Sequence, residues 1–182
     1  LGERKEAIFA VTIPEEKGSF LNFCRALQGR NITEFNYRAS TSSAAQVFVG
    51  ISLKGGEKER HDIYATLATQ YDVDDLSDDE VAKLHIRYLV GGHADIENER
   101  LFRVEFPERP GALLTFLERL GPTHNITLFH YRNHGAAEGR VLVGLEAEDA
   151  QQNPDGLIKT LESITYPYLE ITNNLGYQRF LK

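Results

Sequence analysis

The spacing of apolar residues along the chain changes several times between a period of two and a helical period. Residues 7–15 alternate and stop at Pro14, and apolar residues then recur at helical spacing over 20–27. Two later alternating stretches are joined by a small polar turn, which is typical of a hairpin. The pattern predicts strands at 7–15, 32–38, 46–53 and 71–76, and helices at 20–27 and 57–70.

The second half of the chain repeats the first. Phe9–Leu27 reads FAVTIPEEKGSFLNFCRAL and aligns with FRVEFPERPGALLTFLERL at Phe102–Leu120. NITEFNYR at 31–38 then aligns with NITLFHYR at 125–132, and VFVG aligns with VLVG. Two copies are too few for a solenoid, so the repeat predicts a pair of compact modules. In the second copy the pattern predicts strands at 101–106, 126–134, 140–147 and 168–172, and helices at 112–120 and 155–164.

The β-α-β-β-α-β order of each copy predicts an α+β fold. Four strands in this order form an antiparallel sheet that carries both helices on one face. We expect the first module at 1–77, a connecting segment at 78–98 and the second module at 99–182.

The connecting segment is too apolar for a flexible linker. Ser77, the last residue of the first module, is followed three residues later by Glu80, a spacing typical of a helix N-terminus. The segment then becomes strand-like at 84–90 and reaches a break at Gly91-Gly92. We expect a helix followed by a strand, docked on one sheet or exchanged between modules, with a hinge at the two glycines.

The predicted sheets carry apolar residues on both faces. Alternate residues from Val47 to Leu53 suit the face that the helices cover, whereas Phe48, Leu128 and Leu142 fall on the opposite face. Apolar residues on that face require cover. We expect the sister sheet or a second chain to supply it, so the modules should be stacked or joined edge to edge.

Composition excludes several classes of protein. The chain has 182 residues, 41% of them hydrophobic, and a net charge of −7 that argues against a nucleic-acid binder. It contains no apolar run of membrane-spanning length. The single cysteine, Cys24, excludes an internal disulfide framework and fits a reducing compartment. The absence of methionine suggests a piece of a longer protein.

Known catalytic and metal-binding patterns are weak or missing. The chain has no G-x-S-x-G elbow, P-loop or glycine-rich dinucleotide turn. The acidic run Asp72–Glu80 predicts a solvated loop and a helix N-terminus, and a metal site is the alternative interpretation. His130 and His134 share a predicted strand face with Arg132 between them, which favours surface or interface roles over metal binding. Cys24 is predicted to be a buried, inert thiol.

The turn between the first strand and first helix is the candidate binding feature. It reads PEEKGS in one copy and PERPGA in the other. A glycine at a helix N-terminus brings free N–H groups close to an anion such as a carboxylate, although a simple glycine-tolerant turn explains the spacing too. Backbone carbonyls or a loop acid would meet an ammonium group, and an apolar gap would take a side chain. The predicted effector-binding residues are Gly18, Ser19, Asn31, Tyr37, Gly111, Ala112, Asn125 and Tyr131.

The repeat order and the P-E-x-x-G turn resemble the ACT family of amino-acid-sensing modules. The strings TEFNYR, DLSDDEVAKLHIRYLVGG, FPERPGALLTFLERL and ITLFHYR resemble, more narrowly, the C-terminal regulatory region of biosynthetic threonine deaminase, also named threonine dehydratase. The likeness runs through both copies and the connecting segment. It implies two tandem ACT-like modules.

The resemblance also implies a function. Isoleucine would bind as feedback inhibitor and valine as an opposing activator. A separate N-terminal catalytic domain, dependent on pyridoxal phosphate (PLP), would convert threonine to 2-oxobutanoate and ammonia. This chain would itself be non-catalytic and hold no cofactor. The fragment would form a dimer and the full enzyme a tetramer, in the cytoplasm or, in a plant, the plastid stroma.

Particular residues follow from the resemblance. In the plant members of that family two effector sites are tied to tyrosines that match Tyr37 and Tyr131, and in the family arginines matching Arg87 and Arg132 are linked to feedback sensitivity. The predicted coupling residues are Arg38, Arg87, Arg132, Gly91 and Gly92. The glycine turn reads Lys17-Gly18 in one copy and Pro110-Gly111 in the other, which leaves open whether both pockets bind.

Three other classes of protein are alternatives to an amino-acid-sensing regulatory region. An oligomerisation module without a ligand would use the second apolar sheet face. An RNA-recognition fold shares the strand order but needs a basic, aromatic-rich third strand, which QVFVGIS and RVLVGLE do not provide. A small hydrolase of ferredoxin-like fold would need a nucleophile or a phosphate cradle.

Overall fold

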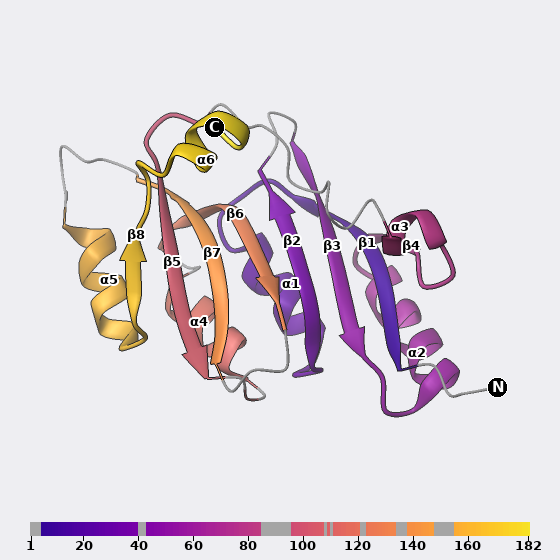
Figure 1. Ribbon diagram of the computed structural model, residues 1–182. Coiled ribbons are helices and arrows are strands. Elements are labelled where there is room, and N and C mark those ends of the chain that lie inside the picture. The colour runs from indigo at the N-terminus through magenta and orange to yellow at the C-terminus, as the bar shows by residue number, and fades with distance from the viewer. Residues whose placement is uncertain are drawn as a thin grey trace.

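The computed structural model describes residues 5–39, 43–84, 96–107, 109, 111–120, 123–133, 138–147 and 155–182 (Figure 1). The predicted strand at 84–90 lies almost wholly outside these residues. So do Arg87, Gly91 and Gly92, which were predicted to couple effector binding to the rest of the protein.

Both repeats fold in the predicted β-α-β-β-α-β order, and the α+β class is confirmed. Predicted and observed element ends differ by roughly two residues, the usual uncertainty of element boundaries. The first repeat comprises β1 Glu6–Pro14, α1 Ser19–Ala26, β2 Ile32–Arg38, β3 Ala44–Ser52, α2 Gly56–Ala68, β4 Asp72–Asp75 and a short helix α3 Glu80–Leu84. The second comprises β5 Glu99–Pro107, α4 Ala112–Leu120, β6 Asn125–Arg132, β7 Glu138–Glu146, α5 Gly156–Ile164, β8 Tyr168–Glu170 and α6 Leu175–Phe180.

The repeats join edge to edge in one sheet with the strand order β4-β1-β3-β2-β6-β7-β5-β8. The joint is the antiparallel pair β2 and β6, whose register places Asn36 opposite His130 at its middle. Because the two strands run in opposite directions, the repeats are related by an approximate twofold axis. The start of each repeat's second strand therefore lies near the end of the other's.

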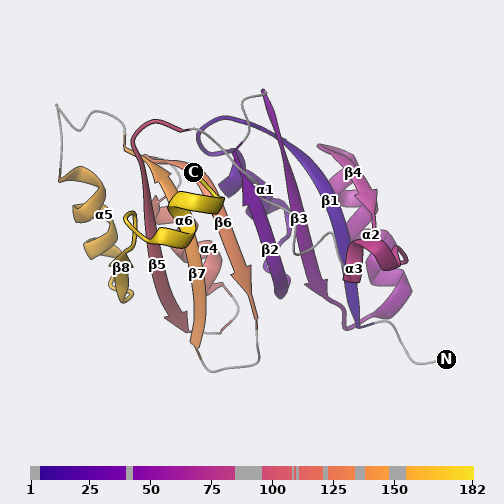
Figure 2. The ribbon, with the colours of Figure 1, turned by 45° about the horizontal axis from the view of Figure 1, so that its top comes forward.

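Helices α1, α2, α4 and α5 cover one face of this sheet (Figures 1 and 2). The strand residues that alternate toward them form one core with the apolar sides of the helices. At the joint the Phe20 ring lies 4.8 Å from that of Phe35 and 4.9 Å from that of Phe129. Phe35 and Phe129 are fully buried, so both repeats contribute to a single aromatic centre.

The opposite face is covered by short helices of the same chain, so the expectation of a sister sheet or second chain over Phe48, Leu128 and Leu142 was wrong. Phe48 packs with Ala82 of α3, and Leu128 packs with Tyr177 of α6. Figure 2 shows α6 lying across the second repeat's strands on this face. Helix α6 was not predicted, because it is too short for helical spacing to be visible.

Ser77 does not cap α3 as predicted. Its Oγ accepts a hydrogen bond from the Ile8 N–H at 2.9 Å, which pins the end of the repeat to β1. The cap is Asp79, whose Oδ1 accepts from the Ala82 N–H at 3.0 Å. An aspartate in this position satisfies one of the free N–H groups at a helix start.

The same two bonds recur in the second repeat. Thr172 Oγ1 accepts from the Leu101 N–H at 3.0 Å, and Asn174 Oδ1 accepts from the Tyr177 N–H at 3.1 Å. The repeated unit is therefore longer than the sequence pattern indicated. Each copy ends in a helix that folds back over the outer face of its own strands.

Candidate functional site

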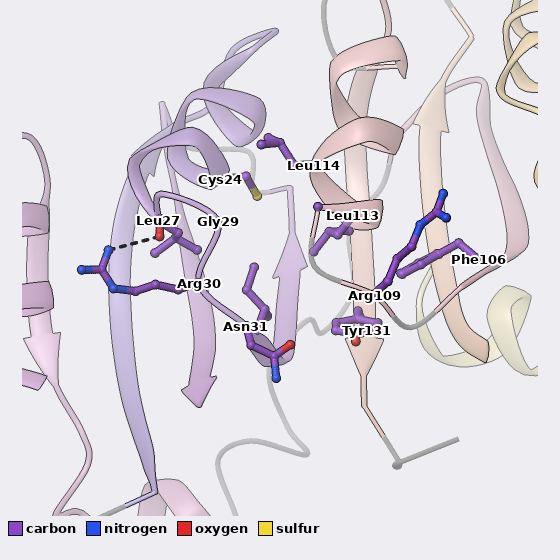
Figure 3. Close-up of a pocket in the computed structure, with 12 residues that line it drawn as sticks. Cys24, Leu27, Gly29, Arg30, Asn31, Phe106, Arg109, Leu113, Leu114 and Tyr131 are labelled. Atoms are coloured by element: carbon purple, nitrogen blue, oxygen red, sulfur yellow. Dashed lines mark hydrogen bonds between the residues drawn. The ribbon is translucent and has the colours of Figure 1, made fainter. Parts of the chain in front are cut away.

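A pocket lies between α1 and α4, where the two repeats meet (Figure 3). Its volume is about 540 Å³, the space at its open mouth included. We name it the Gly111 pocket. It is lined by Cys24, Leu27 and residues 29–32 from the first repeat, and by Phe106, Arg109, Gly111, Leu113, Leu114 and Tyr131 from the second.

A smaller pocket occupies the equivalent position across the approximate twofold axis, with a volume of about 260 Å³ measured in the same way. We name it the Gly18 pocket. It is lined by Glu16, residues 18–21 and Tyr37 from the first repeat, and by residues 124–126 from the second.

The predicted effector-binding residues are divided crosswise between these pockets. Asn31 lies with Gly111 and Tyr131, although it belongs to the other copy. Asn125 lies in turn with the turn and tyrosine of the first copy. Each pocket combines one repeat's glycine turn and tyrosine with the other repeat's asparagine. Of the eight predicted residues, Ala112 alone does not line either pocket.

The glycines of the two turns adopt the same backbone conformation. Gly18 has φ 82° and Gly111 has φ 84°, in the left-handed region that favours glycine. In each turn the N–H group of the first helical residue donates to a carbonyl of the preceding loop. Ser19 donates to Glu16 and Ala112 donates to Arg109, both at 3.2 Å. The next N–H groups of a helix's first turn have no intrahelical acceptor and face outward.

The Gly111 pocket has a polar and an apolar end. Figure 3 shows Cys24 and Leu114 toward one end, and Asn31 and the Tyr131 hydroxyl toward the other. Among the described residues the Asn31 side-chain amide makes no hydrogen bond, whereas the Asn125 amide donates to Glu146 Oε2 at 2.9 Å. This end-to-end polarity matches a small molecule with one charged end and one aliphatic end.

The two tyrosines are buried and belong to the aromatic core as well as to the pockets. Tyr37 donates from its hydroxyl to Glu15 Oε1 at 2.8 Å. Burial, followed by the negative charge of Glu15 and this hydrogen bond, raises the pKa of Tyr37 well above its usual range. The Tyr131 ring packs 5.7 Å from that of Phe106. Tyr37 is thus a neutral donor whose hydroxyl is already engaged.

Arg109 supplies a cation to the lining of the Gly111 pocket, where the Gly18 pocket has Glu16 at the aligned position. Arg30 also lines the Gly111 pocket, but its guanidinium points away from it in Figure 3. Arg30 Nη1 donates to the Leu27 carbonyl at 3.2 Å, and Nε lies 3.9 Å from Glu59 Oε1. The Arg109 guanidinium also points away from the centre of the pocket in Figure 3, so both cations lie at its edge.

Cys24 is buried, as predicted from its place on an apolar helix face. Burial strongly raises the pKa of its thiol, which keeps it protonated and unreactive. Its position on the wall of the Gly111 pocket was not foreseen. The only signal in the sequence is that the aligned residue of the second repeat is the larger Leu117.

Arg38, a predicted coupling residue, forms a buried ion pair between the repeats on the outer face of the sheet. Its Nη1 and Nη2 donate to the two carboxylate oxygens of Glu99 at 2.6 and 3.1 Å. Nη2 also donates to the Leu181 carbonyl at 2.6 Å. Thr127 donates to Glu99 at 2.5 Å, and the Tyr177 hydroxyl donates to it as well. One carboxylate thus ties β2, β6 and the helix α6 region together.

Gly144 makes this crossing possible. Glu99 on β5 reaches over β7 to β6 and β2, and a Cβ at Gly144 would lie 2.8 Å from Thr127 Oγ1 and 3.2 Å from Glu99 Oε2. The first repeat has the same arrangement, with Thr33 donating to Glu6 at 2.6 Å over Gly50. The final glycine of VFVG and VLVG therefore leaves room for a crossing carboxylate.

Arg132 aligns with Arg38 and lies opposite Glu34 at the other end of the joint. No group of three or more His, Cys, Asp or Glu side chains could hold a metal ion within the described ranges. In the acidic run, Asp75 and Asp78 pair with Arg60, at 3.2 and 3.1 Å. None of the helices in the described part of the chain is long and apolar enough to cross a membrane.

Fold and pockets together define a class: a duplicated α+β unit whose two copies share one sheet and enclose pockets at their joint. The chain belongs to the family of C-terminal regulatory domains of threonine dehydratase, whose pattern it matches over residues 1–86 and 90–181. It is 52% identical over 183 residues to the biosynthetic L-threonine dehydratase IlvA of Escherichia coli, covering 100% of this chain and 35% of that protein.

More distant relatives come from eukaryotes. The mitochondrial threonine dehydratase of Saccharomyces cerevisiae is 41% identical over 191 residues, which cover 100% of this chain and 33% of that protein. The chloroplastic biosynthetic threonine dehydratase of Arabidopsis thaliana is 34% identical over 174 residues, which cover 96% of this chain and 29% of that protein. The chain thus spans about a third of the length of the curated relatives it matches.

Among solved structures, the regulatory subunit of aspartate kinase from Thermus thermophilus matches with a TM-score of 0.34 and 12% identity. The match covers 88% of this chain and 93% of that one.

Proposed function

We propose that this chain is the allosteric regulatory region of a threonine deaminase. It binds isoleucine as feedback inhibitor and valine as opposing activator in the pockets between its repeats. It controls a PLP-dependent catalytic domain in the remainder of the protein and performs no catalysis itself. The proposal rests on one observation above all: the glycine turn, tyrosine and asparagine singled out by sequence converge, across the two repeats, on one pocket with a polar and an apolar end.

The lining suits a branched-chain amino acid. Leu113, Leu114 and Cys24 would surround the aliphatic side chain. The outward N–H groups of the first turn of α4 would hold the carboxylate, and the charge of Arg109 at the edge of the pocket would favour an anion there. The Asn31 amide oxygen and nearby backbone carbonyls would accept from the ammonium group.

The energies are of the right size for regulation. Isoleucine and valine differ by one methylene, worth about 1–3 kcal/mol in a fitted apolar pocket. Allosteric coupling between two sites is typically about 1–3 kcal/mol. A ligand difference of this size is enough to make the two amino acids opposing signals, provided that they favour different arrangements of the repeats.

The crosswise construction gives a route for the signal. A ligand that touches both repeats stabilises one arrangement of the β2–β6 joint over others. The Arg38–Glu99 ion pair fixes the same joint from the opposite face and reaches α6 through Leu181. We expect effector binding and this ion pair both to act on the arrangement of the β2–β6 joint.

Self-association is part of the proposal, as a dimer of this chain and a tetramer of the complete protein. Helix α6 carries Leu175 and Phe180, which are 76% and 71% exposed. A contact between two copies of the chain through α6 would cover these side chains. If no ligand binds, a purely oligomerising role for the chain becomes the better reading.

Isothermal titration of the 182-residue chain tests the proposal. Isoleucine and valine should bind saturably, whereas D-isoleucine and threonine should bind at least about tenfold more weakly. The double variant Asn31→Ala/Asn125→Ala should weaken isoleucine binding, while Asn133→Ala, outside both pockets, should not. Absence of saturable heat from a folded chain would refute the proposal.

A further inference from the structure

We propose that the two pockets are not equivalent: the Gly111 pocket takes the amino acid, and Phe20 fills the Gly18 pocket from within. This inference rests on the proposed function and names which of the two sites operates. It makes Phe20 and its counterpart Leu113 the residues that decide where a ligand binds.

Phe20 and Leu113 occupy the same position, two residues after the glycine of each turn. The Phe20 side chain is buried, and its ring packs 5.2 Å from that of Tyr37, in addition to its contacts with Phe35 and Phe129. Leu113 is only half-buried and lies along the wall of the larger pocket. A benzyl group therefore fills, in one copy, the space that an isobutyl group leaves open in the other.

A second difference enlarges the same pocket. Cys24 of α1 lines the Gly111 pocket, and its counterpart on α4 is Leu117. Leu117 is fully buried and does not line the Gly18 pocket. The smaller side chain thus faces the larger pocket, so both substitutions between the repeats favour a cavity on the same side.

Charge and hydrogen bonding agree with this assignment. At the aligned position of the two turns the Gly18 pocket carries the acidic Glu16 and the Gly111 pocket the basic Arg109, so the charge of the lining disfavours a carboxylate in the Gly18 pocket. The polar groups of the Gly18 pocket are also engaged: Tyr37 with Glu15, Asn125 with Glu146, and His124 with Thr160 Oγ1 at 3.2 Å. A ligand there would have to displace existing bonds as well as an aromatic ring.

The test is an exchange of the two side chains. Titration of the unaltered chain with isoleucine should give one equivalent per chain. Leu113→Phe should weaken binding more than about tenfold by filling the pocket. Phe20→Leu should leave the first equivalent unchanged, because Phe20 does not line the Gly111 pocket.

Further variants keep the result interpretable. Cys24→Leu should weaken binding as Leu113→Phe does, through the opposite wall, and both should unfold in urea with one cooperative transition. The combination of Phe20→Leu with Glu16→Arg should raise the stoichiometry toward two. If either Leu113→Phe or Cys24→Leu fails to fold, the other variant still decides between the pockets.

The outcomes separate this inference from the proposed function. Two equivalents in the unaltered chain, or full binding by Leu113→Phe and Cys24→Leu, would overturn the assignment to the Gly111 pocket while leaving an amino-acid sensor in place. No binding by the unaltered chain would overturn both.

Discussion

The substitution Arg38→Ala tests whether the two repeats are fastened through the outer face. The Arg38 and Glu99 side chains are 3% and 0% exposed, and the pair is 2.6 Å apart. Removing one partner of a buried ion pair leaves an uncompensated charge and typically costs about 3–5 kcal/mol. We therefore expect Arg38→Ala to lower the free energy of unfolding by about that amount.

A matched control exists in the same sheet. Arg100 and Glu170 form a pair of similar geometry, 2.7 Å apart, but their side chains are 25% and 38% exposed. Because solvent screens this pair, Arg100→Ala should cost no more than about 1 kcal/mol. Urea unfolding monitored by circular dichroism measures both. Equal losses of under about 1 kcal/mol for the two variants would refute the view that the Arg38–Glu99 pair holds the joint.

Three further predictions concern other residues of the same sheet and of α6. Gly144→Ala should destabilise the chain by about 1–3 kcal/mol in urea unfolding, because its Cβ would lie within 3 Å of two side chains. Tyr177→Phe should cost about 1.5–3 kcal/mol, since it removes a hydrogen bond to the Glu99 carboxylate, and should speed amide exchange in α6 selectively. The hydrogen bond from Arg100 lowers the folded-state pKa of Glu170 below 4.5, so the group stabilises the folded chain above that pH and loses this contribution as pH falls through the lowered value. Glu170→Gln should therefore flatten the acid side of the stability profile below about pH 5, and an unchanged slope would contradict this.

Much of the fold was predictable because the same pattern of strands and helices occurs in both repeats. Periods of two and of helical spacing recur in register, so each copy supports the element assignments of the other. Helix α6 was not predicted because a helix of six residues is too short to show a helical period. Its cap, Asn174, does align with Asp79, and Thr172 aligns with Ser77, so the repeat held a signal beyond the last strand.

The site was predictable only in part. The glycine turns and tyrosines could be singled out, because a left-handed glycine before a helix has a recognisable pattern. Their association with the asparagine of the opposite copy depends on the pairing of β2 with β6, which no local pattern encodes. Likewise, the partner of Arg38 is a glutamate three strands away in the sheet, and only the recurrence of Glu, Thr and Gly at matching positions hinted at it.

Crystals of the 182-residue chain grown with isoleucine would test the central claim most directly. We predict one isoleucine in the Gly111 pocket, with its carboxylate toward the first turn of α4 and its side chain against Leu113 and Cys24. The Gly18 pocket should hold Phe20 and no ligand. Isoleucine bound away from the joint of the repeats, or between chains without contact to Gly111, would contradict the account.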